Sequence, residues 1–296
     1  MTTTPLAEGR AGTRVVRREA LHFAVRNGKL VAGFGLVLAL LLLGLLGPLV
    51  LGVTAPNEYV AAPMLPPSAE HWFGTTTFGQ DVFTQFVYGL RTTFAAGALG
   101  GGIAAVIAMV VGFAAGYRGG LVDEVLNMLT NVVLVIPTLA VLLIVNAYLG
   151  IRSVAVQALF IGLTSWPWAA RAIRAQTFSL RGRDFVDLAR LSGLSTPRII
   201  AREIAPNMSS YLFMTFILLF GGSVLIASSL DFIGLGPTEG VSLGLMLQNA
   251  TQWSALQLGL WWWFVPPGLA ITAIVGALYV ANVGLDEVFN PKLRTT

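Results

Sequence analysis

The sequence contains no cysteine and very little charge. Among its 296 residues, Asp, Glu, Lys and Arg account for 11%, against about 25% in an average soluble chain. The absence of Cys excludes disulfides, thiolate nucleophiles and Cys-ligated metals. With 55% hydrophobic residues, a soluble domain of this composition would expose large apolar patches to water. These properties exclude a soluble enzyme and predict an integral membrane protein.

In place of charge, the chain has a series of long apolar segments. Each reaches the roughly 20 residues that a helix needs to cross a hydrocarbon core of about 30 Å. We therefore predict an all-α membrane protein with six transmembrane helices, at residues 30–53, 92–115, 126–149, 154–172, 209–231 and 261–283. Polar residues between 248 and 257 place that segment in an extracytoplasmic loop, because lipid would penalise them.

The distribution of Lys and Arg gives the orientation. With the N-terminus inside, 16 of the 18 basic residues fall in cytoplasmic segments, and only Arg91 and Arg152 fall outside. Cytoplasmic loops of membrane proteins carry such an excess, so both termini are expected in the cytoplasm. The largest cytoplasmic segment between two spans covers residues 173–208.

Two features inside the spans indicate a packed, bent bundle. The second span has a small residue at every fourth position, which lets another helix approach closely. In the third span, Pro137 removes a backbone hydrogen bond and is a candidate hinge. Both features are common in membrane bundles, so neither identifies a substrate. The small residues are Ala96, Gly100, Ala104, Ala108, Gly112 and Gly116.

The sequence also lacks the groups that would power transport or catalysis. No charged residue or His lies in the middle of a predicted span, although proton relays and ion-coupled carriers need such residues. We find no ATP-binding P-loop, no set of metal ligands and no Ser/His/Asp set. If this protein pumps a solute, its energy comes from a partner.

Segment 173–208 is where such a partner is expected to act. It reads as two short helices: one over 184–192 that stops at Gly193, and one that Thr196 caps and Pro206 limits. One hypothesis is a rigid knob that docks into a groove of another protein. The other is an amphipathic helix that rests on anionic lipid headgroups. Composition alone leaves both open.

The same segment carries a family resemblance. Asp187-Leu188-Ala189-x3-Gly193, followed by Ile204-Ala205-Pro206, resembles the EAA loop of ABC importer permeases, Glu-Ala-Ala-x3-Gly with a later Leu-Pro. In that family the loop is the coupling helix, which fits a cleft on the ATP-hydrolysing subunit. The resemblance implies an ATPase-coupling site formed by Asp184, Asp187, Leu188, Ala189, Gly193, Arg198, Ile204 and Pro206.

Further motifs resemble the oligopeptide/dipeptide/nickel class of these permeases, in the same order along the chain. The first runs from His71 to Val82 and continues to Arg91, with Gln80 where the family usually has Arg. The others lie at 116–123, 232–236 and 290–294. Together the motifs cover residues 25–294 and resemble the C-type subunit, which pairs with a B-type permease.

The resemblance implies a type I ABC importer permease fold in the lipid bilayer of a prokaryotic plasma membrane. The implied partners are a B-type permease, one or two ATP-binding subunits that hold ATP and Mg, and a substrate-binding protein outside, but no nucleic acid. This chain would need no cofactor or metal of its own. The loops at 54–90 and 231–260 are acidic and lack Lys and Arg. The residues expected to face the binding protein are Gly74, Thr75, Gly79, Gln80 and Asp81.

On this basis the chain divides into four parts. They are a basic tail (1–29), a span with its extracytoplasmic loop (30–91), a five-span permease domain (92–283) and a C-terminal tail (284–296). The predicted function is half of the translocation pathway of an ATP-driven importer for peptides or similar solutes, without enzyme activity. The alternatives are an ATP-independent channel or carrier, a membrane enzyme or scaffold, and an importer of nickel chelates, glutathione, haem or sugars.

Overall fold

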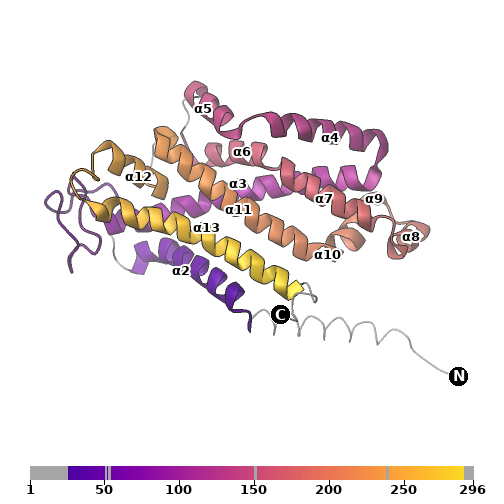
Figure 1. Cartoon of the computed structure of the whole chain (residues 1–296), viewed down its shortest axis with the longest axis horizontal. Coiled ribbons are helices and arrows are strands. Elements are labelled where there is room, and N and C mark those ends of the chain that lie inside the picture. Colours follow the sequence, from indigo (N-terminus) through magenta and orange to yellow (C-terminus); the bar gives the residue numbers. More distant parts are fainter. Residues whose placement is uncertain (1–25, 51, 53–54, 150–151, 238–239, 290–296) are drawn as a thin grey trace.

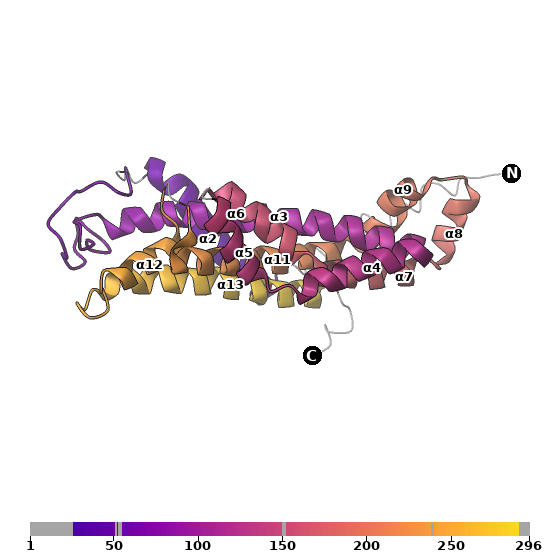
Figure 2. The same ribbon diagram turned by 90° about the horizontal axis from the view of Figure 1, so that it is seen from above.

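The computed structural model describes residues 26–50, 52, 55–149, 152–237 and 240–289. In these residues the chain forms helices and loops, with two isolated antiparallel bridges. The predicted all-α fold is confirmed. The helices form an elongated bundle, which carries α8 and α9 at one end and α12 at the other (Figure 1; Figure 2 shows it from above).

The described elements, labelled as in Figure 1, follow in chain order. They are α2 (Gly28–Val50), α3 (Val82–Arg118), α4 (Gly120–Val135), α5 (Thr138–Leu149), α6 (Val154–Ser165), α7 (Pro167–Leu180), α8 (Asp184–Leu191), α9 (Thr196–Ile199), the π-helical turn η1 (Ile200–Ile204), α10 (Ala205–Asn207), α11 (Ser209–Leu230), the π-helical turn η2 (Asp231–Leu235), α12 (Leu243–Gln252) and α13 (Trp261–Phe289).

Several of these elements are able to span a membrane. By length and composition, α2, α3, α13 and α11 with η2 each qualify alone. α4 and α5 qualify as a pair that is bent by 75°, and α6 is a shorter apolar helix. These elements coincide with the six predicted spans. Since only four or five of them meet the criterion, the count of six and the side of each terminus stay predictions.

Several helices begin or end at other residues than the predicted spans, and two of these differences have a clear local cause. α3 begins at Val82 rather than at residue 92, because Asp81 caps it: the Thr84 N–H donates to Asp81 Oδ1 at 2.7 Å. Arg91 is the charged residue directly before the predicted start of this span. It lies exposed on the side of the helix. The predicted helix over 154–172 is two helices, since Pro167 starts α7 after a break at Trp166.

The bend between α4 and α5 falls at the candidate hinge. Ile136 is extended, with φ −76° and ψ 119°, because a residue before proline avoids the helical region. Pro137 follows and α5 begins at the next residue. Pro137 therefore marks a bend in the structure, and motion about it stays a prediction.

The small residues of α3 place this helix in the centre of the bundle, against α6, α7 and α11. All six are buried. A Cβ atom at Gly112 would lie 2.8 Å from the Ile173 side chain, and one at Gly116 would lie 2.7 Å from Thr177 Cβ. The predicted close approach of another helix is confirmed.

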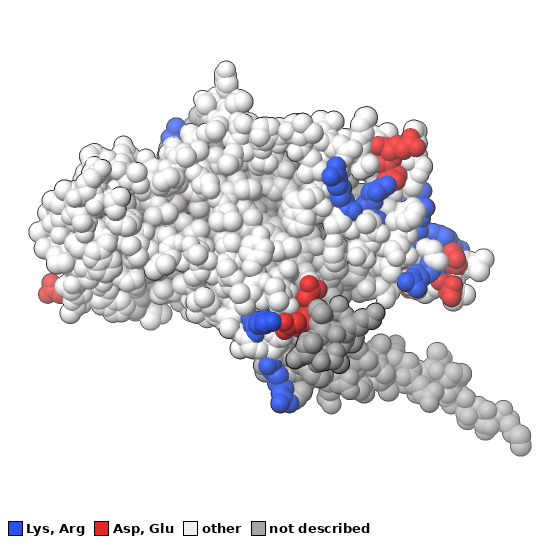
Figure 3. Space-filling view, viewed as in Figure 1, with Lys and Arg blue, Asp and Glu red and all other residues white. Residues whose placement is uncertain are grey.

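The first and last long helices are joined at their charged ends. Near the start of α2, Lys29 pairs with Glu287 of α13, with 2.5 Å between Nζ and Oε1. Asn27 Nδ2 donates to the other oxygen of Glu287 at 2.8 Å. On the face drawn in Figure 3, Lys and Arg gather mainly toward the end that carries α8 and α9. The tails at 1–25 and 290–296, with the 290–294 motif, lie outside the described residues.

Candidate functional site

The segment at 184–206, which is predicted to be cytoplasmic and is called the elbow below, begins with the amphipathic helix α8. Val186 and Ala189 are buried in a core that includes α7 and α11 residues. On the opposite side, the Leu188 and Leu191 side chains are 64% and 85% exposed. The elbow therefore has a packed base and an apolar tip, made of Leu188 and Leu191.

A glycine turn ends α8, as the sequence predicts. Gly193 has φ +73°, a region in which glycine has no steric cost. The Leu194 N–H donates to the Ala189 carbonyl at 3.2 Å, and the Gly193 N–H donates to the Arg190 carbonyl at 3.0 Å. These are the two hydrogen bonds of a Schellman motif. The motif fixes the direction in which the chain leaves α8.

The second half of the elbow differs in detail from the prediction. Thr196 is the first residue of α9, and Ser195 occupies the cap position. The chain then runs through the π-helical turn η1 into α10, so Pro206 lies inside a helix rather than limiting one. Proline is accepted there because the early N–H groups of a helix need no intrahelical acceptor.

Arg190 anchors the elbow to the bundle. Its Nε donates to the Tyr117 hydroxyl at the end of α3 (3.2 Å), and its Nη2 donates to the Arg181 carbonyl at the end of α7 (3.2 Å). Its Nη1 donates to Asp187 Oδ1 at 2.8 Å. The hydrogen bond with Tyr117, helped by the charge of Asp187, raises the pKa of Arg190 above its ordinary value. Arg190 thus stays charged and links three segments.

The ends of α3, α4 and α7 are joined beneath the elbow. Gly119, with φ +68°, allows the abrupt passage from α3 to α4. A Cβ atom there would lie 2.8 Å from Arg181 Nη1, so a larger residue would have to displace that guanidinium as well as adopt a left-handed φ. Asp123 of α4 forms an ion pair with Arg174 of α7. Residues of the 116–123 motif therefore build the base of the elbow.

The predicted coupling residues separate into two groups. Ala189 and Ile204 are buried and shape the elbow from inside. Those on the outside are Asp184, Asp187, Leu188, Gly193, Arg198 and Pro206. Sequence reasoning missed Leu191, Arg190 and Tyr117. Helical spacing could have placed Leu191 beside Leu188, but the contact of Arg190 with Tyr117 joins residues 73 positions apart and has no local signal.

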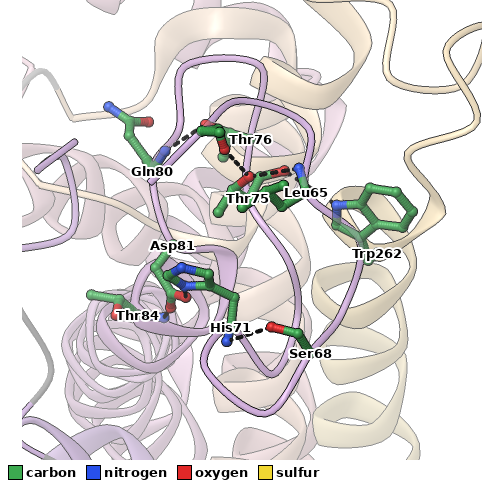
Figure 4. Close-up of polar contacts among 10 residues, drawn as sticks. Leu65, Ser68, His71, Thr75, Thr76, Gln80, Asp81, Thr84 and Trp262 are labelled. Carbon is green, nitrogen blue, oxygen red and sulfur yellow. Dashed lines mark hydrogen bonds and ion pairs between the residues drawn. The ribbon is translucent and has the colours of Figure 1, made fainter. Parts of the chain in front are cut away.

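The loop before α3, which is predicted to be extracytoplasmic, is a compact, internally bonded structure (Figure 4). Thr75 is fully buried at its centre. Its hydroxyl donates to the Ala62 carbonyl at 2.8 Å and accepts from the Leu65 N–H at 2.9 Å. Its carbonyl accepts from Trp262 Nε1 of α13 at 3.2 Å. The loop is therefore fixed to the last helix.

The end of this loop is fixed to α3. His71 Nδ1 lies 2.9 Å from Asp81 Oδ2, the carboxylate that caps α3. Gln80 donates to the Asn57 carbonyl at 3.2 Å and accepts from Gln85 Nε2 at 2.9 Å. The amide of Gln80 thus uses both its donor and its acceptor where the family pattern has Arg.

The predicted binding-protein-facing residues lie largely inside this loop. Gly74, Thr75 and Gly79 are buried, and Gln80 and Asp81 are half-buried. Contact with a binding protein stays a prediction. The outer surface of the loop offers other residues for it, including Tyr59, Glu70 and Trp72, all exposed.

The second segment that is predicted to be extracytoplasmic contains a helix. α12 buries Leu243 and Met246 against the bundle core, and Trp253 packs edge-on against Phe78 of the first loop at 4.7 Å between ring centres. Asp231 is only 4% exposed, so it adds no charge to the outer surface, in contrast to the acidic loop that the sequence suggested. Among the described residues, no three metal-ligating side chains converge.

This arrangement of apolar helices, with a bonded loop at one end and an elbow at the charged end, defines a multi-pass membrane protein of the permease type. Residues 108–295 match the family described as the binding-protein-dependent transport system inner membrane component. The chain belongs to this family. Its members are transport components, so this chain is a permease subunit of an ABC importer and not an enzyme.

Individual relatives match nearly the whole chain. The dipeptide transport system permease protein of Bacillus subtilis is 28% identical over 270 residues, which are 91% of this chain and 83% of the relative. The oligopeptide transport system permease protein of Mycobacterium tuberculosis is 30% identical over 287 residues, 96% of this chain and 95% of the relative. A putative peptide transport system permease protein of Brucella abortus is 30% identical over 273 residues, which are 91% of this chain and 90% of the relative.

Proposed function

We propose that this chain is the C-type permease of a peptide importer in a prokaryotic plasma membrane. It would form the translocation path with a B-type permease, receive peptides from an extracytoplasmic binding protein and be driven by ATP- and Mg-binding subunits. The names of the relatives support the peptide substrate, since they refer to dipeptides, oligopeptides or peptides. The coupling itself is argued from the elbow.

The observation that carries the proposal is the apolar tip on a fixed base. Leu188 and Leu191 point away from the bundle core while Val186 packs into it. Exposed apolar side chains gain free energy when another surface covers them. A groove on an ATPase subunit would provide that surface, and the base would transmit its movement.

The carboxylates of α8 favour a protein groove over lipid headgroups as the surface that covers the tip. Asp184 and Asp187 lie exposed in the first turn of α8, and Asp187 flanks Leu188. An anionic membrane surface repels carboxylates, whereas lipid-resting helices carry Lys and Arg on the polar face. On α8 two carboxylates accompany the single Arg190, so α8 fits the docking hypothesis better than the lipid hypothesis, whereas the exposed Arg198 and Arg202 lie further along the elbow.

The elbow has direct connections to the helices that would move. Arg190 bonds to the ends of α3 and α7, and the chain continues from α10 into α11. α3, α7 and α11 all contact one another. Rigid-body movement of packed helices is a common switching mode, so a push on the elbow would be carried into the bundle by these three helices.

The test compares two glycines next to α8. A Cβ atom at either Gly193 or Gly182 would meet nothing within 4 Å, but only Gly193 has a left-handed φ. Gly193→Val forces a side chain into a conformation that costs about 1–2 kcal/mol, and more for a β-branched residue. We expect it to lower uptake of radiolabelled trialanine at least tenfold in proteoliposomes of the full importer, with Gly182→Val as the control.

Assembly is measured in the same preparations by co-purification of the ATPase subunits. Reduced uptake with retained assembly, and a similar loss in Asp187→Lys, would support coupling through the elbow. Unchanged uptake in both Gly193→Val and Asp187→Lys would refute it. Absence of any ATP-dependent trialanine uptake by the unmodified importer would refute the peptide substrate, and competition with nickel chelates or glutathione would then identify the solute class.

A further inference from the structure

Helix α4 lies at one edge of the bundle and has a joint at each end (Figure 1). Gly119 and Gly120, which connect it to α3, both have a left-handed φ, +68° and +55°. At its other end, Pro137 marks the bend of 75° toward α5. Hinges are a few residues at the ends of elements that absorb large changes in φ and ψ, and glycine does so at little steric cost. α4 is therefore a rigid segment between two hinge points.

α4 contributes little to the packed core. Of its 16 residues, only Thr130 is buried. Among the described elements, α4 packs mainly against α3 and α7. The bilayer or the partner permease would cover its outward face, so only the inward face ties α4 to this chain. The outward face carries apolar side chains that are 50–83% exposed, namely Leu121, Val125, Met128, Val132 and Val135.

α7 contacts α3 and α4 in two different ways. Toward α3 the contact is close: a Cβ atom at Gly112 would lie 2.9 Å from the Ala170 carbonyl oxygen, and one at Gly116 would lie 2.6 Å from the Arg174 carbonyl oxygen. Arg181 adds to this contact, because its Nη1 donates to the Gly116 carbonyl at 3.4 Å. Such close packing of backbones makes α3 and α7 one rigid unit.

Toward α4, α7 uses two arginines instead. Arg174 forms an ion pair with both oxygens of Asp123: Nη2 donates to Oδ2 at 2.5 Å, and Nε donates to Oδ1. One turn closer to the start of α7, Arg171 Nη2 donates to Asn131 Oδ1. The Arg174 and Asp123 side chains are 35% and 17% exposed, so opening the pair would not strand either charge in an apolar core. An interface of this kind can open, whereas interlocked backbones cannot.

We propose that α4 swings on its two end joints during transport, and that the Asp123–Arg174 pair is the clasp that holds it against α7 between cycles. The inference rests on the proposed function and adds a pair of positioning residues to it. Movement of the elbow would reach α7 through the bond from Arg190 to the Arg181 carbonyl. Because α7 is fixed to α3 while α4 is only jointed to α3, this movement would act on the clasp first.

A cross-link across the α4–α7 interface tests the movement. The chain has no cysteine, so two introduced cysteines form its only thiol pair. Asn131→Cys/Arg171→Cys places them at the second polar contact and leaves the clasp intact. Lys29→Cys/Glu287→Cys is the control, because this contact also joins two helices, α2 and α13, but lies outside the α4–α7 interface.

Both variants are treated with a short bis-methanethiosulfonate reagent in proteoliposomes of the full importer, whose partner subunits carry no cysteine. We expect the link between positions 131 and 171 to lower trialanine uptake at least about tenfold, since it blocks a required conformational step, and dithiothreitol to restore it. The link between positions 29 and 287 should leave uptake nearly unchanged. Full uptake with α4 linked to α7, verified by mass spectrometry of the linked peptides, would overturn the proposal.

Charge exchange tests the clasp itself. Asp123→Asn should free α4 without movement of the elbow, so uptake falls and the ATP hydrolysed per transported trialanine rises several-fold. Asp123→Arg/Arg174→Asp rebuilds the pair with exchanged charges and should recover most of the lost coupling. Glu124→Gln is the control, because Glu124 is the neighbouring carboxylate and lies exposed on α4. A purely structural role of Asp123 would lower uptake and ATP hydrolysis in proportion, and an unchanged ratio would therefore refute the clasp.

The unmodified importer and the two controls separate the clasp from the proposed function. If they take up trialanine, the outcomes above concern the clasp alone, and each experiment decides where the other's variant fails to co-purify with its partners. Absence of uptake by the unmodified importer would refute the peptide substrate instead. The clasp is then judged by ATP hydrolysis of the full complex without peptide, which should be higher in Asp123→Asn than in Glu124→Gln; equal rates would refute it.

Discussion

Gly101 and Gly102 are neighbours on α3 with opposite surroundings. A Cβ atom at Gly101 would lie 2.7 Å from Phe220 Cα and 2.8 Å from Phe220 N, while one at Gly102 meets nothing within 4 Å. Carbon atoms in contact normally lie about 3.5–4.0 Å apart. Because the atoms at Gly101 are backbone atoms, Gly101→Ala would force α11 to move by about 1 Å, whereas Gly102→Ala would move nothing.

The two variants share every other effect. Both replace glycine in a helix interior by alanine, a gain of about 0.8–1 kcal/mol, so this contribution cancels in the comparison. Overpacking of a well-packed core costs about 1–3 kcal/mol, which is the expected difference in the free energy of unfolding. Denaturation of the purified chain in mixed detergent micelles, followed by Trp fluorescence, would measure it. Equal stability of the two variants, or a more stable Gly101→Ala, would refute the close packing of α3 on α11.

Two further substitutions test single polar contacts. Arg190→Ala removes the hydrogen bond that holds the elbow to Tyr117. Since Arg190 is partly exposed, the free energy of unfolding should fall by less than about 1 kcal/mol. Uptake should nevertheless fall several-fold, because the elbow loses its anchor. Arg183→Ala is the exposed control, and equal uptake in the two variants would contradict the anchoring role. Asp231→Ala removes the acceptor of Gln157 Nε2 (2.7 Å) and of the Ser242 hydroxyl. Gln157 Nε2 keeps its bond to the Ala227 carbonyl at 3.3 Å, whereas the buried Ser242 hydroxyl loses this acceptor. The loss should cost about 1–3 kcal/mol, measured as a lower melting temperature than for Ser229→Ala; an unchanged value would contradict it.

The fold could be predicted largely because lipid imposes a simple rule on sequence. Charge-free segments of span length are unambiguous, and the start of α11 coincides with the prediction at Ser209. The boundaries failed where a local signal outweighed charge. α3 begins upstream of Arg91 because Asp81 caps it, and a cap with a good acceptor stabilises a helix start. The charge of Arg91 does not prevent this, since its side chain lies exposed on the helix surface. The break at Trp166 was missed because proline at a helix start and proline inside a span look alike in sequence.

The candidate site was less accessible to sequence reasoning. The turn at Gly193 and the helix before it carry local signals, and both were predicted. The anchoring of Arg190 and the burial of Asp231 depend on contacts between residues far apart in the chain, which no periodicity reveals.

The elbow and the break between α6 and α7 belong to one mechanical unit. α7 runs from Pro167, at this break, to the Arg181 carbonyl at the elbow. α11 likewise follows the elbow in the chain and contacts α3, α6 and α7. Because helices transmit displacement along their axes and packed cores resist gradual deformation, a shift of the elbow would reach the α6–α7 break without passing through a flexible loop. Uptake should therefore be more sensitive to substitutions at the two ends of α7 than to those on its exposed lateral face.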